Sequence, residues 1–211
     1  MLTPLPFPKA RLEAITDGIF AVAMTLLVLD LKFQDRVSGD PARVFHDLLA
    51  LLPYIDDYAI SFAVLCVFWI AHLRLIRRVR EVDSTFVWLN LLFLLFTTFV
   101  PPLTSWVGHN GTEPAAAVVY GLNLALIMGA ETLMWRRACR HLVNETVSDA
   151  DALWRSVRLR FIVSLAIIVT GIATALLEIQ HAQKVDYASY VYLLLIGAGL
   201  ARRKLDPHGK A

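Results

Sequence analysis

The sequence predicts an all-α, polytopic membrane protein: a bundle of six transmembrane helices that forms a single domain over residues 1–211. Three bulk observations lead to this prediction: 57% of the residues are hydrophobic, 18% are charged and the mean hydropathy is +0.59. Soluble domains usually carry about 25% charged residues. A core of this size cannot bury so much apolar surface, so lipid has to cover it. At about 20 residues per span, six spans and short loops use the whole length.

The six predicted spans are apolar segments separated by short polar or basic stretches. The third and fifth are the cleanest apolar runs. The second becomes polar at His72 and Arg74, and the fourth contains Asn123 and Glu131. The spans cover residues 11–32, 53–76, 85–107, 115–135, 159–180 and 187–203.

The first span differs from the others because its uninterrupted apolar stretch is short. It runs only from Gly18 to Leu29, with Asp17 before it and Asp30 after it. A spanning helix usually needs about 20 apolar residues. A short apolar middle between charged ends suits a helix that faces water at both mouths rather than lipid all round.

Positive charge is divided unevenly between the two sides of the predicted bundle. Sixteen of the 20 Lys and Arg residues flank the termini and two basic loops on one side, whereas Lys32, Arg36, Arg43 and Lys184 lie on the other. Cytoplasmic loops are rich in Lys and Arg. We therefore expect a multi-pass protein of the plasma membrane with both termini in the cytoplasm. Because orientation explains the basic residues, the expected partner is the lipid bilayer and not a nucleic acid.

Motifs that would indicate an enzyme are missing from the sequence. It has no glycine-rich phosphate loop, nucleophile elbow or paired-histidine metal signature. It also lacks the TVGYG filter of channels with a carbonyl-lined pore loop. We expect no enzyme activity, no cofactor and no structural metal. What remains are polar side chains at membrane depth, which are costly and mark candidate functional sites.

Three of these polar residues fall at about one depth. Counted from the cytoplasmic helix ends at ~1.5 Å per residue, Asp17, His72 and Asn90 share a level, and Trp69 lies slightly deeper. We expect hydrogen bonds among the first three helices there. The structural interpretation is that this polar layer only locks the helices together. It is favoured because a buried charge needs partners in any protein. The functional interpretation is that the layer also holds a pore helix or relays protons.

A stripe of aliphatic residues follows one face of the first helix. Val22, Leu26 and Leu29 are spaced i, i+4 and i+7, and Thr25 lies beside them, whereas Asp17 points away from the stripe. Periodicity alone favours ordinary helix packing. The alternative is that copies of this helix surround a pore, in which rings of aliphatic side chains gate by dewetting.

Residues 11–31 resemble the first helix of a known channel family, the prokaryotic relatives of the lysosomal potassium channel called transmembrane protein 175. That family has an Arg-x-x-x-Phe-Ser-Asp signature at the cytoplasmic end of its first helix. Here the signature reads from Arg11 to Ile15-Thr16-Asp17. Arginine and aspartate match, and the two replacements are mild.

The second predicted span strengthens the resemblance. Its segment from Phe68 to His72 looks like the family's Trp-x-x-His pattern, with Trp69 in the tryptophan position. The specific similarity lies in residues 11–32 and 60–78, while the six-span layout extends it to the whole chain. The two motifs agree in order, spacing and topology.

The resemblance implies a homotetrameric cation channel that selects potassium over sodium, with the first helix of each subunit lining a central pore. It maps the pore-narrowing hydrophobic position to Val22, a hydroxyl position to Thr25 and a further apolar position to Leu29, and Leu26 completes the stripe. Valine is smaller than the isoleucine or leucine expected at 22, so Leu26 and Leu29 are alternatives for the narrowest ring. Potassium would be the permeant ion, with no cofactor.

The resemblance also assigns a role to the polar residues. It maps Arg11, Asp17, Trp69 and His72 to an interhelix hydrogen-bond network, which agrees with the polar layer inferred from depth. Two acidic residues, Glu13 and Asp30, flank the two mouths of the first helix, where negative charge raises the local cation concentration.

Two alternatives to a passive potassium channel remain open. A proton-conducting or proton-coupled transport protein would use Asp17 and His72 as titrating groups. An intramembrane enzyme would cluster catalytic residues at one depth, but no nucleophile or metal set accompanies the polar layer. We expect neither broken helices nor an internal repeat, which counts against a transporter built from inverted repeats.

Overall fold

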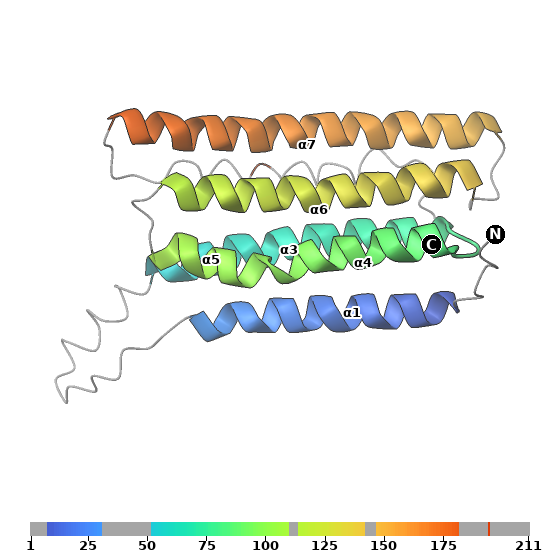
Figure 1. The fold of residues 1–211 in the computed structure, drawn as a ribbon, viewed down its shortest axis with the longest axis horizontal. Coiled ribbons are helices and arrows are strands. Elements are labelled where there is room, and N and C mark those ends of the chain that lie inside the picture. The colour runs from blue at the N-terminus through green and yellow to red at the C-terminus, as the bar shows by residue number, and fades with distance from the viewer. Residues whose placement is uncertain (1–7, 31–51, 110–113, 142–146, 182–193, 195–211) are drawn as a thin grey trace.

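The computed structural model describes residues 8–30, 52–109, 114–141, 147–181 and 194. These residues form long helices that lie side by side in a bundle (Figure 1). The predicted span 187–203 lies outside the described residues except for position 194. The helices are α1 (Lys9–Leu26), the short 3-10 helix η1 (Leu27–Asp30), α3 (Leu52–Arg78), α4 (Ser84–Thr98), α5 (Val100–His109), α6 (Pro114–His141) and α7 (Val147–His181).

Five segments of the described chain are long and apolar enough to cross a membrane, so the protein is a multi-pass membrane protein. Each corresponds to one of the first five predicted spans. The fifth begins earlier than the predicted residue 159, because α7 continues through basic residues that interrupt the apolar pattern without breaking the helix. The five segments are Lys9–Leu29, Ile55–Arg78, Ser84–Gly108, Ala115–Arg140 and Asp151–Thr174.

The helices are arranged so that α1 and α7 lie at opposite edges of the bundle (Figure 1). Between them, α6 packs along α7 and α4, and α1 packs against α3 and α4. The start of α1, the α3–α4 turn, the end of α6 and the start of α7 all lie at one end (Figure 1). The basic residues near these points are therefore gathered at that end, which we call the arginine-rich end.

The third span is interrupted, which corrects the expectation that no helix is broken. Helix α4 ends at Thr98 and α5 begins at Val100, with Phe99 between them at φ −80° and ψ −12°. The cause is the pair Pro101-Pro102, since proline lacks an N–H and its ring clashes with the carbonyl four residues earlier. Because Phe99 keeps helical angles, the break is a kink within one span.

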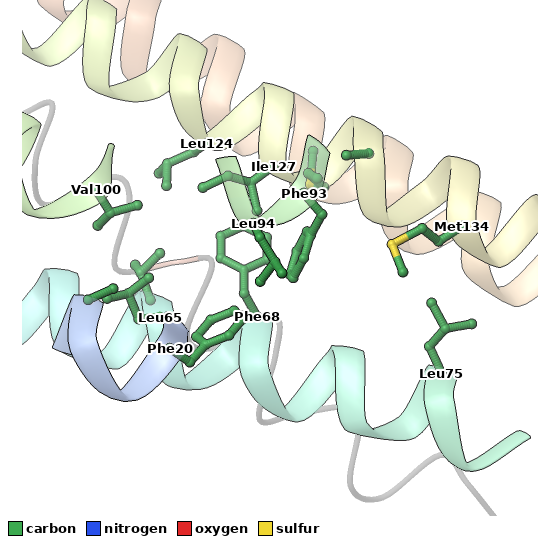
Figure 2. Packing of buried hydrophobic residues seen from close by; sticks show 14 of the residues in the cluster. Phe20, Leu65, Phe68, Leu75, Phe93, Leu94, Val100, Leu124, Ile127 and Met134 are labelled. Carbon is green, nitrogen blue, oxygen red and sulfur yellow. The ribbon is translucent and has the colours of Figure 1, made fainter. Parts of the chain in front are cut away.

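The apolar core joins α1, α3, α4 and α6 (Figure 2). Phe20 of α1 packs against Phe93 of α4 with ring centroids 5.8 Å apart, and Phe68 and Leu65 of α3 fill the space beside them. Lipid tails are as apolar as these side chains. Close packing and hydrogen bonds, rather than exclusion of water, therefore hold such a core together.

Candidate pore helix and its polar contacts

Helix α1 has two distinct faces. One face is buried against α3 and α4 by residues spaced three or four apart, as a helix period requires: Leu12, Thr16, Phe20 and Ala23, a series that the buried Leu27 of η1 continues. On the other face, the stripe residues Val22, Leu26 and Leu29 are 43–68% exposed within the chain. The predicted stripe is therefore on the surface of the subunit and outside its core.

The end of α1 keeps the stripe aligned. Leu29 lies in η1, where the chain tightens to a 3-10 helix. In that geometry residues three apart lie directly above one another, so Leu26 and Leu29 stay on one line. The stripe borders an apolar groove whose wall on the other side includes Thr98 of α4.

Thr25 is also exposed, beside the stripe. Its hydroxyl donates back to the Ala21 carbonyl and the Val22 carbonyl, both at 2.9 Å. This common pattern in helices uses the proton of the hydroxyl. The acceptor lone pairs of the oxygen are then available on the exposed face.

Two adjacent residues of α1, the buried Thr16 and the exposed Asp17, are tied to two neighbouring helices by hydrogen bonds. Trp69 Nε1 of α3 donates to Asp17 Oδ1 at 2.9 Å. Asn90 Nδ2 of α4 donates to Thr16 Oγ1 at 3.1 Å, and Thr16 Oγ1 donates to the Leu12 carbonyl at 2.8 Å. Adjacent residues of α1 thus contact different helices, which restrains rotation of α1 about its axis.

His72 is buried in the same layer but differs from the expected hydrogen-bonded arrangement. It is 2% exposed and stacks on Phe93, with ring centroids 5.2 Å apart and planes 11° from parallel. Among the described residues, neither ring nitrogen has a hydrogen-bond partner, and the same holds for Asn90 Oδ1. Stacking on Phe93 orients the His72 ring. Asp17 Oδ1 accepts its hydrogen bond from the Trp69 indole and not from His72.

The charged residues at the ends of α1 have local contacts. Glu13 forms an ion pair with Lys9 at 3.8 Å, one turn before it, and Lys9 Nζ donates to the Val79 carbonyl at 2.9 Å. Arg11 is exposed and, within the described residues, has no side-chain partner in the polar layer. Asp30 is the last residue of η1.

Two groups of interhelix contacts were not predicted as site residues. Thr16 was read only as a mild replacement in the signature, yet it is the α1 partner of Asn90. Ser61, Thr104 and Tyr120 form a buried cluster that joins α3, α5 and α6, at 2.8 Å for Thr104 to Ser61 and 3.1 Å for Ser61 to Tyr120. Both groups could have been predicted from the sequence, because hydroxyl residues within apolar spans often form hydrogen bonds between helices.

Fold and contacts together define a polytopic helical membrane protein whose first helix is held by polar contacts on one face and exposes an aliphatic stripe on the other. The family model described as "Endosomal/lysosomal potassium channel TMEM175" matches residues 11–101. A potassium channel of Streptomyces collinus is 35% identical over 159 residues, which cover 72% of this chain and 75% of that protein. The chain belongs to the TMEM175 family.

Two further comparisons extend this result. The crystal structure of a lysosomal potassium-selective channel TMEM175 homolog from Chamaesiphon minutus has a TM-score of 0.71 and 26% identity, covering 92% of this chain and 97% of that one. The endosomal/lysosomal proton channel TMEM175 of Mus musculus is 38% identical over 104 residues, which are 46% of this chain and 20% of that protein. The similarity to the Chamaesiphon minutus structure covers nearly the whole of this chain, whereas the similarity to the mouse protein covers less than half of it.

Proposed function

We propose that this protein is a potassium channel that conducts passively through a pore lined by α1. The observation that carries the proposal is the two-faced α1: one face is held by Trp69 and Asn90, and the other presents Val22, Leu26 and Leu29 outside the subunit core. Membership of the TMEM175 family and the potassium-channel names of the bacterial relatives support it.

The pore would form between copies of the chain. One α1 has too little surface to enclose a pore, so several copies have to contribute, and the family resemblance implies a homotetramer. Facing stripes would then form stacked aliphatic rings of Val22, Leu26 and Leu29, a constriction of the kind that gates by dewetting. Native mass spectrometry of the purified protein is expected to show four chains of 23.6 kDa.

Polar groups along α1 would serve the permeant ion. In an open state the exposed Thr25 oxygens replace part of the water shell of potassium. Glu13 and Asp30, near the two ends of the helix, raise the local concentration of cations. The Asp17–Trp69 and Thr16–Asn90 hydrogen bonds keep the stripe turned toward the pore.

A flux assay in liposomes tests the proposal. A protonophore lets protons cross the membrane and compensate the charge that the ion carries, so that charge build-up does not limit the flux. Under these conditions potassium is expected to move down its gradient faster than sodium. Protein-free liposomes and liposomes with heat-denatured protein are the controls. Equal potassium and sodium flux would show that the channel is not selective for potassium. If neither ion moved, the proposal that the protein conducts ions would be wrong.

The second candidate function is proton conduction through the polar layer. The observation in its favour is His72, which is buried near the charge of Asp17 with both ring nitrogens unpaired among the described residues. In the same liposomes without protonophore, this function requires pH equilibration that fails in a folded Asp17→Asn variant. Potassium flux without pH equilibration would reject it.

A further inference from the structure

A cleft of about 70 Å³ lies between α3, α6 and α7. Figure 1 places α7 at the edge of the bundle opposite α1, so this cleft is separate from the candidate pore face. Most of its wall is apolar and includes Val64 and Phe68 of α3, Met128 of α6 and Phe161 of α7. This lining suits a hydrocarbon chain.

Charged side chains from all three helices also line the cleft: Arg74 of α3, Glu131 of α6 and Arg160 of α7. Glu131 and Arg160 each have polar interactions within the protein, while no carboxylate of the described residues forms an ion pair with Arg74. Two arginines against one glutamate in the lining favour an anionic group in the cleft.

Along α3, the charged and the apolar parts of the cleft lie at different depths. Arg74 is in the last turns of α3, which ends at Arg78, and Arg160 immediately precedes the apolar part of α7. Both arginines are therefore near the arginine-rich end of the bundle. Val64 lies ten residues earlier in α3 than Arg74, or ~15 Å deeper at 1.5 Å per residue. On α3, therefore, the cleft is cationic near this end of the bundle and apolar deeper, while Phe161 lies directly beside Arg160 on α7.

We propose that this cleft binds an anionic phospholipid from the leaflet at the arginine-rich end. Its phosphate lies at Arg74 and Arg160, and one acyl chain lies along the apolar wall. Arginine has a planar fork of N–H donors that binds phosphate oxygens. Basic pockets between transmembrane helices are known to hold acidic headgroups. Binding there would stabilise the α3–α6–α7 side of the bundle.

The test measures thermal unfolding of the full chain in detergent with added phosphatidylglycerol or zwitterionic phosphatidylcholine. A ligand that binds only the folded state raises the unfolding midpoint. Phosphatidylglycerol is expected to raise it by several degrees more than phosphatidylcholine. The difference should disappear in Arg74→Gln and in Arg160→Gln. It should persist in the controls Arg77→Gln and Arg158→Gln, which remove exposed arginines from the same two helices.

Each variant is compared with itself in the two lipids, so a variant with a lower midpoint still gives a result. If the lipid effect persists in Arg74→Gln and Arg160→Gln, or falls equally in the two controls, general surface charge explains it and the proposal fails. Because the measurement requires no ion flux, it is independent of the proposed channel function.

Further measurements test whether the cleft binds the acyl chain of the lipid as well as its headgroup. Ala71→Phe narrows the cleft without changing its charge and is expected to reduce the effect of phosphatidylglycerol. Ala166→Phe, at an exposed position of α7, should leave it unchanged. Inorganic phosphate alone should give a much smaller rise than phosphatidylglycerol. An equal rise with phosphate would mean that the cleft binds a free anion and would overturn the lipid assignment.

Discussion

Individual side chains decide how α1 is oriented. Asp17 places a carboxylate within an apolar helix, and Trp69 from α3 supplies it with an indole N–H. One residue earlier, the Thr16 hydroxyl accepts from Asn90 of α4. A carboxylate without a partner at this depth is costly. The rotation of α1 that satisfies both residues therefore also determines which face is left exposed.

Removing the indole donor should destabilise the protein. Trp69→Phe leaves Asp17 Oδ1 without its hydrogen bond, and interhelix hydrogen bonds in membranes contribute about 0.6 kcal/mol on average and up to about 1.7 kcal/mol. We expect a loss near the average value, because Asp17 is exposed within the chain and solvent weakens the interaction. Thermal unfolding in detergent measures it. Trp88→Phe, at an exposed position of α4, is the control, and an equal loss there would show that the indole hydrogen bond is not the cause.

The Thr25 hydroxyl should matter for ion flux but little for folding. Thr25→Val keeps the shape of the side chain and removes the oxygen, so potassium flux in liposomes should fall several-fold. Thr170→Val on α7 removes a hydroxyl with the same type of back-bond, to the Ala166 carbonyl at 2.8 Å, and should leave flux unchanged. Unaltered flux in the Thr25 variant would exclude an ion contact for this oxygen.

Two helical elements carry features that a straight, uniform helix would not have. At the end of α1, the turn of η1 keeps Leu26 and Leu29 on one line. At the kink between α4 and α5, the Phe96 carbonyl accepts from the Phe99 N–H at 3.2 Å and from Asn123 Nδ2 of α6 at 3.1 Å. The kink is therefore paired with a side chain of a neighbouring helix, as buried irregular backbone in a membrane has to be.

A polar residue in the stripe should weaken the proposed gate. Val22→Ser introduces a hydroxyl ring that holds water in the constriction, so potassium flux should rise and the preference over sodium should fall. Val169→Ser on α7 is the matched control, because the two valines are 56% and 55% exposed within the chain. Identical behaviour of the two variants in the flux assay would place Val22 outside the pore.

The kink and Asn123 should be energetically coupled. Asn123→Leu removes one donor from the Phe96 carbonyl and should cost about 1 kcal/mol of stability. In a Pro101→Ala, Pro102→Ala background α4 and α5 can join, and the Val100 N–H can then reach that carbonyl. The cost of Asn123→Leu should be smaller in that background. A double-mutant cycle by thermal unfolding gives the coupling, and a value near zero would refute it.

Basic residues are concentrated at one end of the bundle. The antiparallel sequence of helices brings the basic segments beside α1, α3, α6 and α7 to one end, although they are far apart in the chain (Figure 1). The same arrangement leaves α1 at one edge, free to meet other copies, and places the cationic cleft at the other edge. Conduction and lipid binding would therefore use opposite sides of one subunit.

The arginine-rich end should face the cytoplasm. With Cys66 and Cys139 replaced by serine, a single cysteine is introduced by Arg80→Cys at that end or by Gly108→Cys at the other. A membrane-impermeant thiol reagent added to intact cells is expected to label only the Gly108→Cys protein. Permeabilised cells, in which both should react, are the control. The reverse labelling pattern would invert the proposed topology.

The class of protein, the first five spans and the residues of the family signature could all be predicted from the sequence alone. These are local properties, because apolar length, charge distribution and i, i+4 spacing can be read along the chain without knowing its contacts. The hydroxyl partner Thr16 and the kink at Phe99 were missed. Their significance depends on which side chain or carbonyl of another helix lies opposite.

Which residues of the polar layer pair with one another depends on how the helices pack in three dimensions. Depth places Asp17, His72 and Asn90 at one level, but it does not give the rotation of each helix about its axis. In the folded bundle, one rotation of α1 satisfies both the packing of Phe20 against Phe93 and the polar contacts. With that rotation Trp69 reaches Asp17, Asn90 reaches Thr16, and His72 stacks on Phe93 rather than donating to a neighbour.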